Sequence, residues 1–101
     1  MRNTLDGGEA IVEACRKLEC KYILSSPGTE WAPVWEAMAN QQQAGTDGPV
    51  LMDVWHETLA VDIAMGYTMV TGEMQMVLLH AGAGLLQGNM GIHGAFCAGV
   101  P

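Results

Sequence analysis

Positive charge is scarce in this chain of 101 residues. The basic residues are Arg2, Arg16, Lys17 and Lys21, against eleven Asp and Glu residues, and the formal net charge is −7 at pH 7. A surface that binds nucleic acid or an anionic membrane needs a cluster of Lys and Arg. The composition therefore argues against nucleic acids and membrane surfaces as partners.

Cysteines with metal-binding spacing are also lacking. Cys15, Cys20 and Cys97 form no CxxC pair, and no further set of zinc ligands accompanies them. We therefore predict no metal site in this chain. An odd number of cysteines at ordinary spacing indicates reduced, partly buried thiols in a cytoplasmic protein. The polar N-terminus has no apolar segment of the kind that marks a signal peptide.

Charged residues are absent from Met74 to Pro101. A run of this length is compatible with a membrane span. However, the run contains six glycines between Gly82 and Gly99 and several polar side chains. A buried strand followed by a buried helix explains the run better, so we predict no membrane span. The polar side chains are Gln75, His80, Gln87, Asn89 and His93.

Helix and strand patterns alternate along the chain. Asp6 to Glu9 resembles a capping box, with Asp6 as the N-cap. Strands that alternate with helices indicate an α/β fold, a parallel sheet flanked by helices. The segment 99–101 is typical of a connector to a further strand, so we expect an incomplete domain. Predicted helices cover Gly7–Glu19, about Trp31 to the segment 41–45, His56–Thr71, and a glycine-rich stretch ending near Ala98; predicted strands cover Lys21–Ser26, Val50–Trp55 and Gln75–His80.

The predicted third helix carries large and small side chains on different faces. Large apolar residues at helical spacing predict a core-facing stripe. Small residues elsewhere allow a neighbouring element to approach closely. The large residues are Leu59, Ile63, Tyr67 and Val70, and the small ones are Ala60, Ala64 and Gly66.

Glu57 follows the second predicted strand and lies in the first turn of the third predicted helix. Ligands of open α/β sheets bind at the carboxyl ends of the strands, so a carboxylate here is a candidate for chemistry. The alternative is a surface glutamate that the helix dipole favours. His56-Glu57 also begins like the zinc-protease motif HExxH, but position 60 is Ala, so that motif fails.

His80 is the last residue of the third predicted strand, and the glycine-rich segment 82–88 follows that strand. His80 is either a ligand-facing residue or a structural, partly buried histidine. The segment 82–88 loosely resembles a dinucleotide-binding loop, in which backbone N–H groups hold phosphate. Close packing of a helix explains the glycines equally well. His93, within the last predicted helix, is expected to serve packing.

Three segments together resemble the pyrimidine-binding (PYR) domain of thiamine-diphosphate-dependent enzymes. The relatives are acetolactate synthase, benzoylformate decarboxylase and sulfopyruvate decarboxylase. Ser26–Val34 is similar to the family's strand–PG–helix turn. His56–Gly72 follows its pattern of HE, alanines, GY and TG, and Gly82–Pro101 is similar to its GPG…N…G…A…P run. The departures are Gln87 for asparagine, Ala83 for proline, and Thr68-Met69 for Ala-Arg.

The resemblance implies roles for particular residues. Glu57 matches the glutamate that activates the cofactor through N1′ of its aminopyrimidine, which helps the 4′-imino nitrogen take the C2 proton. His80 and Thr29 fall at active-site positions of benzoylformate decarboxylase, where they would face the substrate. The other expected cofactor-binding residues are Pro27, Gly28, Gly82, Gly84 and Gln87.

The resemblance also implies partners. In the family a second domain with a GDG…N motif binds Mg²⁺ and the diphosphate, and this motif is absent from the sequence. The cofactor lies between two subunits, so we expect a homo- or hetero-oligomer. The expected function is decarboxylation or acetolactate synthase-like carboligation of 2-oxo acids, with no activity of this chain alone. The alternatives are a Rossmann-like nucleotide-binding module and a non-catalytic subunit or remnant.

Overall fold

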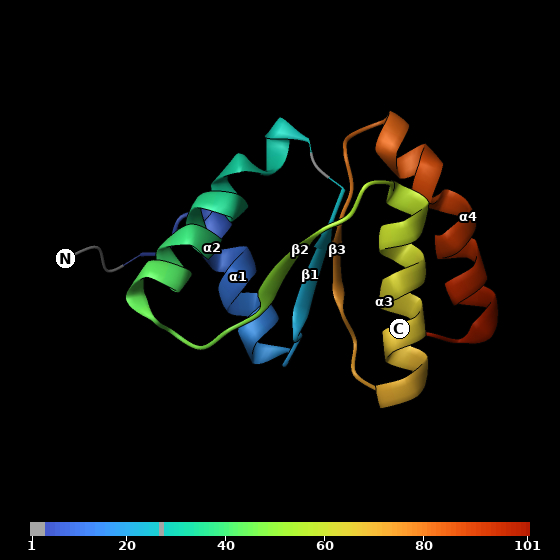
Figure 1. Cartoon of the computed structure of the whole chain (residues 1–101), viewed down its shortest axis with the longest axis horizontal. Coiled ribbons are helices and arrows are strands. Elements are labelled where there is room, and N and C mark those ends of the chain that lie inside the picture. Colours follow the sequence, from blue (N-terminus) through green and yellow to red (C-terminus); the bar gives the residue numbers. More distant parts are fainter. Residues whose placement is uncertain (1–3, 27) are drawn as a thin grey trace.

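The computed structural model describes residues 4–26 and 28–101, which form a layered α/β domain (Figure 1). Within these residues the sheet is parallel, with strand order β2-β1-β3. Helices α1 and α2 cover one face, and α3 and α4 lie on the other. The predicted α/β fold is confirmed. The elements are α1 (Gly7–Lys17), β1 (Tyr22–Ser25), the 3-10 helix η1 (Thr29–Trp31), α2 (Ala32–Ala44), β2 (Val50–Asp53), α3 (Glu57–Thr71), β3 (Met76–Leu78) and α4 (Ala83–Ala98).

The helix starts follow their local sequence signals. Asp6 Oδ1 accepts the backbone N–H of Glu9 at 2.8 Å, and Glu9 Oε2 accepts the backbone N–H of Asp6 at 2.8 Å. The predicted capping box is therefore confirmed. His56 is the N-cap of α3, and its Nδ1 accepts the backbone N–H of Thr58 at 3.1 Å. Glu57 is consequently the first residue of this helix.

The buried face of α3 differs from the predicted one. Leu59 is 48% exposed and Val70 is 86% exposed, so the stripe of large residues does not face the core. The buried positions are Ala60, Val61, Ala64 and Thr68. Small side chains let α3 approach the sheet and α4 closely, and this packing outweighs the burial of larger residues. Gly66 is exposed and takes no part in a close approach.

Glycines of α4 set the distance between α3 and α4. A Cβ placed on Gly91 would lie 2.8 Å from Val61 Cγ1 and 3.1 Å from Val61 Cβ. A Cβ on Gly88 would lie 2.8 Å from Leu79 Cδ1 and 3.4 Å from Val61 Cγ2. A Cβ on Gly94 of the same helix would meet nothing within 4 Å. The face with Gly88 and Gly91 is therefore the contact surface of α4.

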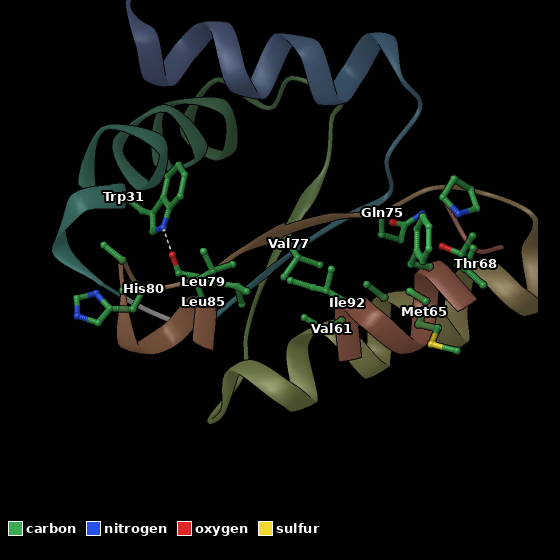
Figure 2. Close-up of a pocket in the computed structure, with 17 residues that line it drawn as sticks. Trp31, Val61, Met65, Thr68, Gln75, Val77, Leu79, His80, Leu85 and Ile92 are labelled. Carbon is green, nitrogen blue, oxygen red and sulfur yellow. Dashed lines mark hydrogen bonds between the residues drawn. The ribbon is translucent and has the colours of Figure 1, made fainter. Parts of the chain in front are cut away.

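An apolar groove of about 600 Å³ runs along β3 on the side of α3 and α4 (Figure 2). β3 pairs only with β1 among the described strands, so its other edge is unpaired. His80 lies at one end of the groove, and Thr68 and Gln75 lie toward the other end. Ala81 and Gly82, which follow His80 in the sequence, also line the groove. Its middle is lined by Val61 and Val77.

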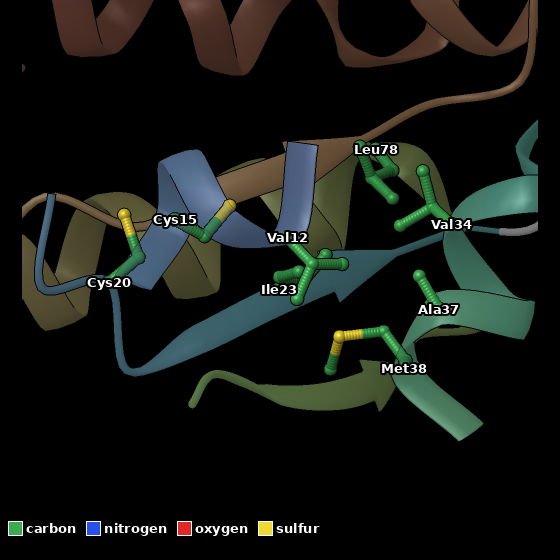
Figure 3. Packing of buried hydrophobic residues seen from close by; sticks show 8 residues of the cluster. All are labelled: Val12, Cys15, Cys20, Ile23, Val34, Ala37, Met38 and Leu78. Atoms are coloured by element: carbon green, nitrogen blue, oxygen red, sulfur yellow. The ribbon is translucent and has the colours of Figure 1, made fainter. Parts of the chain in front are cut away.

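The sheet buries a different cluster on each face. Ile23 and Leu24 are adjacent in β1 and point to opposite faces, as strand geometry requires. Figure 3 shows the cluster on the side of α1 and α2, and the opposite cluster packs under α3. The first cluster contains Val12, Cys15, Cys20, Ile23, Val34, Ala37, Met38 and Leu78; the second contains Leu24, Val54, Ala60 and Ala64.

All three cysteines are free; Cys15 and Cys20 are buried and Cys97 is exposed. This confirms the prediction of unpaired, partly buried thiols. Burial raises the pKa of Cys15 to about 11, so its thiol stays protonated and unreactive at neutral pH.

Among the residues described, no helix is both long and apolar enough to cross a bilayer.

Candidate functional site

The candidate residues gather at the carboxyl-terminal edge of the sheet. Glu57 starts α3 after β2, His80 lies two residues beyond the end of β3, and Gly28 precedes η1 after β1. Gly84 lies between two of them, because a Cβ there would be 2.7 Å from His80 Cβ and 3.0 Å from Glu57 Oε1. The topology thus brings together side chains that are far apart in the sequence.

Glu57 is half-buried against the first turn of α4. Its carboxylate makes no hydrogen bond or ion pair with any residue of the described ranges 4–26 and 28–101. A carboxylate can accept hydrogen bonds but, when ionised, cannot donate them. The N-terminal end of a helix also favours a negative charge. Glu57 therefore presents an acceptor to an N–H donor from outside this part of the chain.

Glu30, His80 and Ala81 form a hydrogen-bonded cluster beside Glu57. His80 Nδ1 lies 2.9 Å from Glu30 Oε1 and 3.0 Å from Glu30 Oε2. The backbone N–H of Ala81 donates to Glu30 Oε1 at 2.6 Å. A Cβ on Gly28 would collide with His80 and Glu30, so glycine is required for this cluster to close.

These contacts tie η1 to the segment that follows β3. The indole N–H of Trp31 donates to the carbonyl of Leu79 at 2.8 Å, next to the contacts of Glu30 (Figure 2). The pKa of Glu30 lies below its ordinary value. The largest causes are hydrogen bonds from the backbone N–H groups of Glu30 and Ala81, and His80 contributes after them. The ionised carboxylate therefore holds this contact at neutral pH, and the contact weakens as the pH falls through the lowered pKa. The Glu30 side chain is 33% exposed, so solvent screening keeps the stabilisation small.

The other predicted site residues have different surroundings. Thr29 begins η1 and is exposed. Gly82 is the N-cap residue of α4 with φ +64°, a conformation that favours glycine. Gln87 is exposed on α4, and its backbone carbonyl accepts the hydroxyl of Thr58 at 2.8 Å. Pro27 lies outside the described residues.

Glu30 belongs to the cluster at this edge of the sheet but is not among the residues predicted from the sequence. The sequence signal for Glu30 is its position two residues after the Pro27-Gly28 turn, which follows the carboxyl end of a predicted strand. Its partner His80 is 50 residues away, and no local pattern joins the two.

The glycines of segment 82–88 have structural reasons that do not involve phosphate. Gly84 packs on His80 and Glu57, and Gly88 packs on Leu79 and Val61. Both glycines are therefore explained by the close approach of α4.

The groove along β3 is separate from Glu57, because Glu57 is not among the residues that line the groove. The end of the groove that His80 lines lies at the same edge of the sheet as Glu57. Within the described residues, no group of three or more His, Cys, Asp or Glu side chains could hold a metal ion.

Ligands of open parallel α/β sheets bind at the carboxyl edge of the sheet, and the unpartnered Glu57 carboxylate lies at that edge. Residues 5–101 match the model of the family described as "Thiamine pyrophosphate enzyme, N-terminal TPP binding domain". The chain belongs to this family. The family implies thiamine diphosphate as the cofactor.

A curated relative is the acetolactate synthase large subunit of Haemophilus influenzae, 31% identical over 97 residues. The match covers 96% of this chain and 16% of the relative. The chain thus spans about a sixth of the length of that relative.

Proposed function

We propose that this chain is the pyrimidine-binding part of a thiamine-diphosphate-dependent enzyme that acts on 2-oxo acids, by decarboxylation or carboligation. The observation that carries the proposal is the Glu57 carboxylate. It is half-buried, lies at a helix start, and has no partner among the described residues. Such a carboxylate is suited to accept a hydrogen bond from the pyrimidine ring.

When bound, the cofactor supplies a thiazolium carbon, C2, that becomes nucleophilic on losing its proton and adds to the keto carbon of a 2-oxo acid. Glu57 would hold a proton at N1′ of the aminopyrimidine and so favour the tautomer that accepts the C2 proton. The close packing of Glu57 against Gly84 keeps the carboxylate in place. Glu57 is thus proposed as an activating acid/base group.

His80 and Thr29 are proposed to face the substrate. His80 lies beside Glu57 across Gly84, and Thr29 begins the turn that carries Glu30. A neutral imidazole has one N–H donor and one acceptor nitrogen, and a hydroxyl can both donate and accept a hydrogen bond. These groups are suited to bind a carboxylate or relay a proton. Gly28, Gly82, Gly84 and Gln87 are proposed to border the cofactor.

A partner domain is proposed to hold the diphosphate and Mg²⁺. The length of the relative supports this assignment, because the match covers only 16% of that protein. Exposed apolar side chains on α4 provide a docking surface for the partner domain, because large exposed apolar patches mark interaction sites. They are Leu86 and Met90, whereas Leu85, Ile92 and Phe96 line the groove along β3. We propose a homo- or hetero-oligomer on this basis.

The unpaired edge of β3 is proposed to receive a further parallel strand. The groove along this edge is apolar, and an uncovered strand edge pairs readily. The free cysteines agree with a location in the reducing cytoplasm.

Titration calorimetry of thiamine diphosphate and of NAD distinguishes the proposal from a nucleotide-binding module. The protein is a preparation that holds this chain together with its diphosphate-binding domain, in Mg²⁺. We expect thiamine diphosphate to bind at least about tenfold more tightly than NAD, a difference of about 1.4 kcal/mol. Tighter binding of NAD would contradict the proposal.

A further inference from the structure

The proposed activation of the cofactor by Glu57 does not require the Glu30–His80 pair. Both oxygens of Glu30 lie within 3.0 Å of His80 Nδ1, and Glu30 is also anchored by the Ala81 N–H. The carboxylate is therefore held by two different groups of the segment after β3. Trp31 Nε1 fixes the same turn to the Leu79 carbonyl. The pair is consequently part of an ordered contact between η1 and this segment.

Hydrogen-bond chemistry fixes the proton on the imidazole ring. Glu30 has a lowered pKa and is ionised at neutral pH, so its oxygens only accept. His80 Nδ1 must then carry a proton and donate it. In a neutral imidazole the other nitrogen, Nε2, is left with a lone pair. Nε2 of His80 has no hydrogen-bond partner in the part of the chain that the structure describes.

We infer that Glu30 is a positioning residue for His80, which fixes the Nδ1–H tautomer and leaves Nε2 as the nitrogen that exchanges protons with the substrate. This inference rests on the proposed function, because it assigns His80 its working atom in that reaction. A carboxylate that holds an imidazole in one tautomer matters for proton transfer far more than for folding. Gly28 contributes by leaving room for the pair.

Nitrogen NMR of the ¹⁵N-histidine-labelled chain reads the tautomer directly and needs no cofactor. Long-range couplings within the ring show which nitrogen carries the proton. In the wild type we expect the neutral His80 ring to be protonated at Nδ1. In Glu30→Ala the acceptor is lost, and a substantial Nε2–H population should appear. Glu36→Ala, at an exposed glutamate of α2, is the matched control and should keep the wild-type tautomer.

A wild-type ring protonated mainly at Nε2 would overturn the inference without any variant. An unchanged tautomer in a folded Glu30→Ala protein would overturn it as well.

Kinetics of the cofactor-loaded enzyme separates this inference from the proposed function. In Glu30→Ala we expect kcat to fall roughly 10²-fold, the low end for a positioned proton-transfer group, while exchange of the cofactor C2 proton changes by less than about twofold. Loss of C2 exchange in Glu30→Ala would contradict a role confined to His80. If wild-type enzyme shows no C2 exchange, the proposed function fails, and the tautomer experiment still decides the role of Glu30.

Discussion

Glu57→Gln is expected to slow turnover of a 2-oxo acid by at least about 10²-fold, since a positioned acid/base group contributes roughly 10² to 10⁴. The glutamine amide retains the size of the side chain and one acceptor oxygen but cannot carry the negative charge that holds a proton at N1′. Release of CO₂ from a panel of 2-oxo acids that includes pyruvate measures the effect. Binding of the cofactor, followed by calorimetry, should weaken much less than turnover.

Glu36→Gln is the control for this substitution. Glu36 is an exposed glutamate of α2 with no hydrogen bond or ion pair assigned in the described residues. Its turnover should equal that of the wild type. A Glu57→Gln enzyme with undiminished turnover would show that Glu57 is only a surface residue favoured by the helix dipole.

Gly91→Ala is expected to destabilise the domain through the contact between α3 and α4. The new Cβ would lie 2.8 Å from Val61 Cγ1, 3.1 Å from Val61 Cβ and 3.1 Å from Asp62 Oδ1. Because Val61 Cβ is fixed to the backbone of α3, the two helices must separate. Overpacking of this kind costs about 1–3 kcal/mol. The higher helix propensity of Ala offsets at most about 1 kcal/mol of it.

Gly94→Ala places the same substitution on the same helix where a Cβ meets nothing within 4 Å. Only the propensity gain remains, so we expect stabilisation by about 0.5–1 kcal/mol. Denaturant unfolding of the two variants should therefore shift in opposite directions from the wild type. A stabilising Gly91→Ala would show that α4 does not approach α3 as closely as described.

The alternation of strands and helices could be predicted from the sequence because each element carries a local signal. The capping box at Asp6 and Glu9 and the glycine that ends α3 at position 72 are such signals. The buried face of α3 could not be predicted from the sequence. Hydrophobic periodicity favoured Leu59 and Val70, but the close approach of two helices selects small residues instead. Close approach is a tertiary property, which no single helix displays.

The candidate site could be predicted in part for the same reason. Glu57 follows one predicted strand and His80 ends another, and parallel strands place their carboxyl ends at one edge. The contribution of Glu30 depends on a contact across 50 residues and on a Gly28 that leaves space for it. The role of Gly84 as a spacer between His80 and Glu57 is likewise visible only in three dimensions.

Exchange of the cofactor C2 proton for deuterium tests the role of Glu57 most directly. The measurement is made by quenched-flow proton NMR on thiamine diphosphate bound to this chain and its diphosphate-binding domain. We expect exchange in the wild type to be much faster than for free cofactor, and in Glu57→Gln to fall by at least about 10²-fold toward the free rate. Equal exchange rates in the two proteins would contradict the assignment of Glu57 as the activating carboxylate.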